Sequence, residues 1–243
     1  MNKKSIIIYL IMWILILILI FIALFLIYQE VQSDKLLRTV THKGRGTWSE
    51  RDLIMKLLKN GFSSERIFHD LYVQKPDGSF SQIDVVIVTE VGIIVVEVKH
   101  LSGWIFGTGN QSKWVQVLAY GKQKYQFYNP IFQNNSHIKF LKGRLSNLDD
   151  IPFYSLIVFY GDCVLKDLSL IPSETNIVKS ADVIQTIKNL SSYARKYHKK
   201  AMGMANKNTD FKDVYDISLM GQKIDSHFTK ALHLKPKSNE NDD

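Results

Sequence analysis

The feature that most constrains this chain is an apolar segment near its start. Ile6 to Ile27 is an unbroken run of 22 apolar and aromatic residues, with no charge, glycine, proline, serine or asparagine. A helix needs about 20 such residues to cross the hydrocarbon core of a bilayer. The sequence therefore predicts a membrane-spanning anchor within residues 1–28, followed by a chain of ordinary polarity.

A cleaved signal peptide is the rival interpretation, because Lys3 and Lys4 precede the apolar run. The apolar part of a signal peptide is about 7 to 15 residues long and ends at small residues. This run is longer, and Tyr28, Gln29 and Glu30 follow it. Its length favours an anchor that is retained.

Residues 29–43 are polar and basic, as in a juxtamembrane linker or an extension of the anchor helix. Such a segment is either solvated or in contact with anionic headgroups. Basic residues collect on the cytoplasmic side of a membrane, and more of them follow the apolar run than precede it: Lys35, Arg38, Lys43 and Arg45 against Lys3 and Lys4. We therefore expect a single-pass protein of the cell membrane with a cytoplasmic C-terminal domain.

Composition excludes two classes of protein and indicates a class of partner. A lone cysteine, Cys163, cannot form an internal disulfide or a zinc site by itself, which excludes disulfide scaffolds and zinc ribbons. The chain has 31 Lys and Arg residues against 23 Asp and Glu residues, and its net charge is +8. A basic balance of this size suits an anionic partner, either nucleic acid or anionic lipid.

Turn signals and apolar periodicity divide the rest of the chain into an α/β pattern, with one domain at residues 44–198. We expect a mixed sheet flanked by helices. Helices are predicted at 48–59, after 129–130 and at 181–198, and strands at 67–73, 81–89, 93–99, 104–106, 113–118, 154–160 and 176–179. Residues 199–243 are predicted to be a basic extension, with one amphipathic helix at 217–231 before a disordered polar end.

The strands at 83–88 and 93–99 are nearly continuous β-branched runs, so both faces of each should be buried. If their turn is two or four residues long, residues whose numbers add up to 181 face each other. Asp84 then lies beside Glu97, and Lys99 projects from the same face of the sheet. A three-residue turn would shift the pairing by one residue and separate these groups.

Two buried carboxylates at this distance repel each other unless a cation neutralises them. Lys99 neutralises only one. Mg²⁺, with Mn²⁺ as a further candidate, takes oxygen ligands from one or two carboxylates and keeps positions for water and phosphate. Asp84, Glu97 and Lys99 therefore suit phosphodiester hydrolysis, in which Lys99 orients the attacking water or stabilises developing charge. The alternative is a structural cross-strand ion pair with a spare carboxylate.

Gln82-Ile83-Asp84, then Gly92, then the segment from Val96 to Gly103 resembles the nuclease-related (NERD) domain, a branch of the PD-(D/E)XK nuclease superfamily. The resemblance covers about residues 44 to 145. Further residues that fit the pattern of that domain are Gly44, Glu50, Trp114, Asn129-Pro130, Gln133 and Leu141-Lys142.

The resemblance implies a restriction-endonuclease-like fold in which Asp84 and Glu97 bind Mg²⁺ and Lys99 assists the attacking water. It also implies that Glu50, on the first helix of the domain, is an additional acidic ligand. Ser49 departs from the pattern, since the family commonly has glycine there. Glu50 has an alternative role as the third helical residue of a capping box that begins at Thr47.

Other residues are candidates for contacts with nucleic acid. Gln82, Gln133 and His137 are placed near the site by the motif and the helix that follows it, although His137 also suits a surface or packing role. Three tyrosines interleaved with lysines suit either stacking on nucleic acid or packing in the core and at a sheet edge, namely Tyr120, Tyr125 and Tyr128 with Lys122 and Lys124.

The hypothesis from the sequence is a membrane-anchored, Mg²⁺-dependent nuclease that hydrolyses phosphodiester bonds, with DNA as the expected substrate. One alternative is a non-catalytic, membrane-tethered module that binds nucleic acid or protein on a nuclease fold. Another is that the basic surface serves lipid association and the charged triad is structural.

Overall fold

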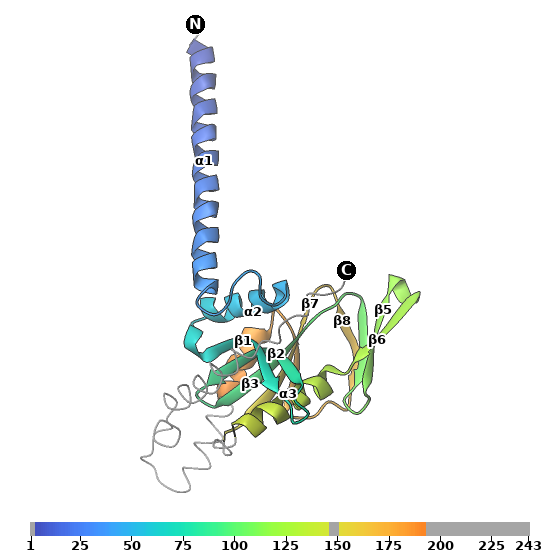
Figure 1. Cartoon of the computed structure of the whole chain (residues 1–243). Helices are drawn as coiled ribbons and strands as arrows, with labels where there is room; N and C mark the ends of the chain where they lie inside the picture. The colour runs from blue at the N-terminus through green and yellow to red at the C-terminus, as the bar shows by residue number, and fades with distance from the viewer. Residues whose placement is uncertain (1–2, 146–150, 193–243) are drawn as a thin grey trace, which may run out of the picture.

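The computed structural model describes residues 3–145 and 151–192. Its most prominent feature is α1 (Lys3–Leu37), a single uninterrupted helix that projects from the rest of the molecule (Figure 1). Tyr9–Leu37 is long and apolar enough to cross a membrane, with a mean hydropathy of 3.5. A signal sequence at this position would have the same properties, so membrane insertion remains a proposal. The helix and polar end predicted within residues 199–243 lie outside the described residues.

The predicted linker begins as a continuation of the helix. α1 runs through Leu37, whose side chain is buried among the core residues Leu53 and Leu57 of the first domain helix. Lys43 folds back to pair with Asp34 at 3.1 Å. The helix-extension alternative therefore describes residues 29–37, and the join between helix and domain is packed.

The central sheet has five strands in the order β1-β2-β3-β7-β9. Its first three strands are antiparallel, whereas β7 and β9 run parallel to β3 and to each other. The strands are β1 (Ile67–Gln74), β2 (Phe80–Thr89), β3 (Gly92–His100), β7 (Phe153–Tyr160) and β9 (Thr175–Lys179). The predicted mixed α/β sheet is confirmed.

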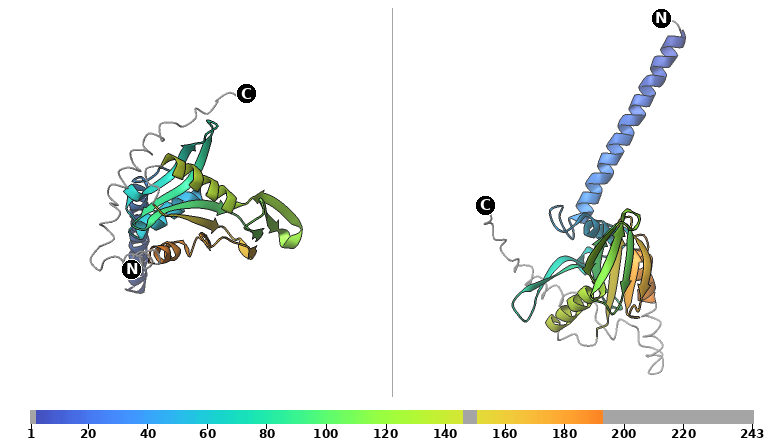
Figure 2. Two further views of the ribbon diagram at one scale, coloured as in Figure 1. Left: turned by 90° about the horizontal axis from the view of Figure 1, so that it is seen from below. Right: turned by 90° about the vertical axis from the view of Figure 1, so that its right-hand side faces the viewer.

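Helices cover both faces of this sheet, which is why β2 and β3 are apolar along most of their length. α2 (Trp48–Lys59) and the helical residues 183–192 pack on one face through Leu53, Leu57, Val183 and Ile187. α3 (Pro130–Arg144) packs on the other face through Leu141. The two layers are visible on either side of the sheet in Figure 2. A short 3₁₀ turn, η1 (Ser64–Arg66), leads into β1.

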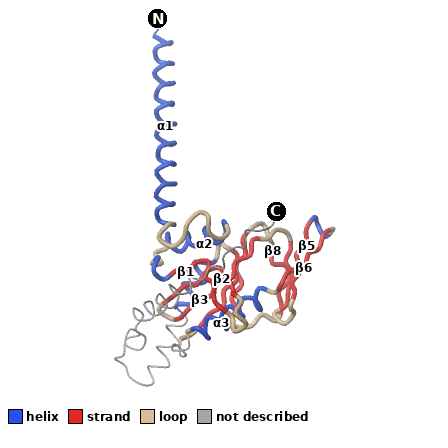
Figure 3. The backbone as a smooth tube through the Cα atoms, viewed as in Figure 1, coloured by secondary structure: helices blue, strands red, loops and turns tan. Residues whose placement is uncertain are grey.

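A second sheet, in the order β6-β5-β4-β8, lies beside the first. Its strands are β4 (Trp104–Thr108), β5 (Lys113–Leu118), β6 (Gln123–Tyr128) and β8 (Val164–Ser169), with the turn η2 (Ala119–Gly121) between β5 and β6. Trp114 joins the two sheets, because its ring stacks on Phe159 of β7 at a centroid distance of 6.3 Å. The β5–β6 hairpin extends beyond the body of the domain (Figures 1 and 3).

Strands β6 and β8 were not among the strands predicted from the sequence. Most residues of both strands are exposed, and their sequences are Gln-Lys-Tyr-Gln-Phe-Tyr and Val-Leu-Lys-Asp-Leu-Ser. An edge strand with little buried surface lacks the apolar run or strict alternation that marks a strand in a sequence. Hydrogen bonding to a neighbouring strand, which no local pattern reveals, determines their conformation.

Candidate functional site

The predicted hairpin register is the observed one. The backbone pairs of β2 with β3 run from Thr89 opposite Gly92 to Val85 opposite Val96, across a two-residue turn. The next residue of β2 is Asp84, and its Oδ2 accepts a hydrogen bond from the backbone N–H of Val98 at 2.7 Å. The Asp84 side chain thus accepts this hydrogen bond in place of a backbone carbonyl of β2, and the bond fixes the Asp84 carboxylate against β3.

Glu97 lies at the centre of the site, with a side chain that is only 1% exposed. Its Oε1 is 2.6 Å from Nζ of Lys99, two residues further along β3. Its Oε2 is 3.3 Å from Nε2 of His137 on α3, yet neither of these two buried atoms makes a hydrogen bond to any described residue. Lys99 therefore neutralises one carboxylate oxygen of Glu97, whereas the other has the His137 ring within ion-pair distance but accepts no hydrogen bond from a described residue.

Lys99 is held from both sides. Besides its ion pair with Glu97, its Nζ donates a hydrogen bond to Oε1 of Gln133 at 3.0 Å. Gln133 lies in the first turn of α3, one turn before His137. The predicted nucleic-acid contacts Gln133 and His137 thus face the charged residues of β3.

The pKa of Asp84 reflects the charge balance of the site. Burial, followed by the nearby charge of Glu97, raises the pKa of Asp84 to about 8, although the Val98 N–H and the charge of Lys99 act in the opposite direction. Lys99 alone does not compensate the buried carboxylate of Glu97 and the half-buried carboxylate of Asp84. The site is therefore short of positive charge, which is the electrostatic condition for binding a cation.

Glu50 is engaged with other partners. Its Oε1 accepts a hydrogen bond from the Thr47 hydroxyl at 2.7 Å, and its Oε2 lies 3.0 Å from Nε2 of His69. Burial acts to raise the pKa of Glu50, but the hydrogen bonds from His69 and Thr47 outweigh it and lower the pKa. Thr47 is the N-cap of α2 and accepts from the Glu50 N–H. Half of the predicted capping box is thus present, and the charge of Glu50 still acts on Asp84.

The His69 side chain connects this helix to the segment after α1. Its Nδ1 shares a hydrogen bond with Oγ1 of Thr41 at 2.7 Å, opposite the contact with Glu50. Gly46 passes directly over this pair with a φ of +65°, and a side-chain carbon there would overlap both His69 and Glu50. The sequence analysis missed His69, because a histidine in a strand carries no signal of the helix and loop that surround it.

Gln82 and Asp70 form a polar contact beside the carboxylates. The amide of Gln82 donates to Oδ1 of Asp70 at 2.7 Å, and Arg45 binds Oδ2 at 2.8 Å. Asp70 has a φ of +54° in the middle of β1, a conformation that aspartate tolerates better than most residues. Gln82 is exposed, and its contact with nucleic acid stays a prediction.

No group of three or more His, Cys, Asp or Glu side chains within residues 3–145 and 151–192 is placed to hold an ion. Two carboxylates are sufficient for Mg²⁺, which keeps several waters and takes phosphate oxygens as further ligands. The unsatisfied Glu97 Oε2 and the raised pKa of Asp84 fit such an ion. Glu50 as a third ligand stays a prediction.

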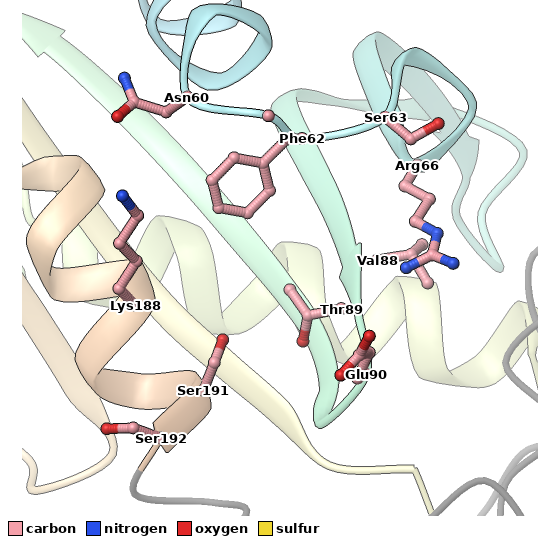
Figure 4. Close-up of a pocket in the computed structure, with 11 residues that line it drawn as sticks. Asn60, Phe62, Ser63, Arg66, Val88, Thr89, Glu90, Lys188, Ser191 and Ser192 are labelled. Atoms are coloured by element: carbon pink, nitrogen blue, oxygen red, sulfur yellow. The ribbon is translucent and has the colours of Figure 1, made fainter.

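A cavity of about 630 Å³ lies elsewhere, at the turn between β2 and β3. Figure 4 shows residues from the end of α2, from this turn and from the helical segment 183–192 around it. Thr89, which lines it, is five residues along β2 from Asp84, or about 17 Å at the rise of a strand. The cavity and the charged site therefore lie at different ends of β2.

The sequence of residues 45–160 matches the family model of the nuclease-related domain, NERD. This range contains Asp84, Glu97, Lys99 and Gln133, so the whole charged cluster belongs to it. The match ends at the last residue of β7.

An uncharacterized protein of Bacillus anthracis is 25% identical to this chain over 216 residues, which cover 87% of this chain and 95% of the relative. That similarity extends well beyond the nuclease-related domain itself. No solved structure matches the chain.

Proposed function

We propose that this protein is a membrane-anchored, metal-dependent nuclease that hydrolyses phosphodiester bonds of nucleic acid, with DNA as the expected substrate. The observation that supports it most directly is the buried Glu97, which shares one oxygen with Lys99 and has no hydrogen-bond partner among the described residues for the other. The match to a nuclease-related domain agrees with this chemistry. α1 is the proposed anchor, with the domain in the cytoplasm.

In this proposal Asp84 and Glu97 hold Mg²⁺ or Mn²⁺ at the point where β2 and β3 lie against α3. A bound ion of this kind polarises a phosphate oxygen and lowers the pKa of its water. The protein supplies the two carboxylates in a fixed position, because Val98 orients Asp84 and Lys99 orients Glu97. Burial of Glu97 keeps bulk water away from the carboxylates and strengthens every charge interaction there.

Lys99 is the proposed cationic group at the scissile phosphate. Its side chain is 22% exposed, whereas that of Glu97 beside it is almost fully buried. It therefore lies between the buried carboxylate and solvent, where a phosphate would approach. The hydrogen bond to Gln133 fixes its position, so it would orient the attacking water or stabilise the charge that develops on the phosphate.

The test is cleavage by the full chain in detergent. Supercoiled plasmid, single-stranded DNA and RNA would be incubated with Mg²⁺, with Mn²⁺ or with a chelator. We expect metal-dependent cleavage, lost by at least about 100-fold in Glu97→Gln and Lys99→Ala. Lys59→Ala is the matched control, because Lys59 is an exposed lysine at the end of α2. Circular dichroism verifies folding, and cleavage that persists in both site variants refutes the proposal.

A second candidate function has one observation in its favour. Glu50 is bound to His69 and Thr47, and the described residues contain no group of three metal-binding side chains. A nuclease fold with an incomplete site would serve as a membrane-tethered module that binds nucleic acid or protein without cutting. Salt-dependent DNA binding, with no cleavage under any divalent ion, would favour this function.

A further inference from the structure

The net charge of the protein is concentrated in one part of the chain. The 51 residues between Glu97 and Asp149 contain no Asp or Glu but seven Lys and Arg residues. The basic residues are Lys99, Lys113, Lys122, Lys124, Lys139, Lys142 and Arg144. Since the whole chain carries +8, the rest of it is almost neutral. This acid-free segment comprises the end of β3, strands β4 to β6 and α3.

The acid-free segment is continuous in space from the charged site to the β5–β6 hairpin. Lys99 binds Gln133 at the start of α3, and the neighbouring Phe132 packs edge-on against Tyr128 at a centroid distance of 6.5 Å. Tyr128 ends β6, where it pairs with Lys113 of β5. From there the hairpin leads away from the body of the domain to the turn at Tyr120 (Figure 3).

Aromatic rings are exposed along this hairpin. The side chains of Tyr125 and Tyr128 are 51% and 52% exposed, and Tyr120 at the tip is 97% exposed. Tyr120 also has φ 54° and ψ 38°, a left-handed conformation that is unfavourable for an aromatic residue. Packing does not explain a ring that contacts almost nothing. Backbone strain at an exposed residue is a common mark of a binding position.

We propose that the β5–β6 hairpin is an arm that binds single-stranded nucleic acid by stacking unpaired bases on Tyr120 and Tyr125. Lys122 and Lys124, the sequence neighbours of these rings, would bind the phosphates. Because Tyr125 and Tyr128 project from opposite faces of the edge strand β6, the nucleic acid would cross that edge to reach Tyr128, α3 and Lys99. The proposal rests on the proposed function, because it names the substrate of that site. Exposed aromatic rings interleaved with lysines are the features that single-strand binding uses.

Charge and continuity select nucleic acid as the occupant. Tyrosine and lysine also occur at lipid interfaces, but a lipid contact would not require the acid-free segment to continue from the tip of the hairpin to Gln133 and Lys99. Strand β6 is the edge of its sheet, and β8, which carries Asp167, is the opposite edge. The acidic residue of this sheet is thus on the far side from the tyrosines.

The experiment measures binding without cleavage. Full-length protein in detergent and chelator is titrated into a fluorescent single-stranded oligonucleotide of about 20 nucleotides, and into the same sequence as a duplex. We expect the single strand to bind more tightly than the duplex. The double variant Tyr120→Ala/Tyr125→Ala should weaken single-strand binding by at least about tenfold, whereas Tyr120→Phe/Tyr125→Phe, which keeps both rings, should bind as the wild type does.

The lysines are tested through salt dependence. Lys122→Ala/Lys124→Ala should lower the slope of log K against log salt by about 1.4, because each phosphate contact contributes about 0.7 on single strands. Lys59→Ala, off the arm, should leave the slope unchanged. Equal affinity for duplex and single strand, or unchanged affinity in the double alanine variant, overturns the proposal. Because chelator prevents metal binding, these outcomes are independent of whether the protein cuts.

Discussion

The Asp84 carboxylate accepts a hydrogen bond from the backbone N–H of Val98 at 2.7 Å, in the place where a strand partner would normally supply a carbonyl. The sheet therefore fixes the Asp84 carboxylate close to that of Glu97, and the two negative charges repel each other. The resulting rise in the pKa of Asp84 makes the stability of the protein depend on pH and on cations.

Stability should fall as the pH rises towards 8. The pKa of Asp84 is about 8 in the folded protein and 3.8 in its ordinary state, so the folded protein holds this proton more tightly than the unfolded chain. Its contribution to stability is complete below about pH 4 and is lost progressively up to about pH 8. Urea unfolding at pH 5.5 and 8 should show a loss on the order of a few kcal/mol, which Asp84→Asn reduces. An unchanged pH dependence in Asp84→Asn would show that another group controls it.

Divalent cations should reverse that loss. Mg²⁺ or Mn²⁺ at about 100 times its dissociation constant adds about 2.7 kcal/mol to the free energy of unfolding. The melting temperature of the wild type should therefore rise at pH 8, and much less in Asp84→Asn or Glu97→Gln. Sodium chloride at equal ionic strength is the control for screening. A rise of the same size in all three proteins would place the ion elsewhere.

Gln133 should act as a positioning residue for Lys99. Gln133→Ala removes the hydrogen bond to the Lys99 ammonium, so the cation loses its fixed place beside Glu97. We expect kcat to fall between about 10- and 100-fold, with KM much less affected. Steady-state kinetics on single-stranded DNA measure the two constants separately. An effect confined to KM would instead make Gln133 a substrate contact.

A side chain at Gly46 should destabilise the protein by steric overlap, and Gly61 serves as the control for backbone strain alone. Gly46 and Gly61 both have positive φ, but a side-chain carbon at Gly61 meets nothing within 4 Å, whereas at Gly46 it would overlap His69 and Glu50. Gly61→Ala should cost about 1–2 kcal/mol from backbone conformation alone. Gly46→Ala should cost about 1–3 kcal/mol more, measured by urea unfolding. Equal losses would mean that the His69 and Glu50 side chains move aside easily.

The sequence predicted what depends on local patterns. The bounds of α2 and β5 are as predicted, and the register that brings Asp84 to β3 followed from a two-residue turn at Glu90-Val91. Gln133 and His137 were predicted from their place on the helix that follows the motif, and both face the site.

The remaining parts of the site depend on tertiary packing. The contact of Glu50 with His69 joins α2 to β1, and no periodicity in either segment indicates it. The exposure of Tyr120 and Tyr125 was also undetermined, because aromatic residues near a sheet edge occur both buried and exposed. The sequence left stacking and packing open. In the structure Tyr120 is almost fully exposed and Tyr125 is half exposed.

The burial of Leu37 in the domain has a mechanical consequence. If α1 crosses a bilayer up to Tyr28, nine further residues of continuous helix set the gap between the membrane and the domain at about 14 Å. A helix that ends in packed side chains transmits its tilt to whatever it carries. The domain would then work in a thin layer along the membrane, and a nucleic acid would have to be brought to that layer to be cut.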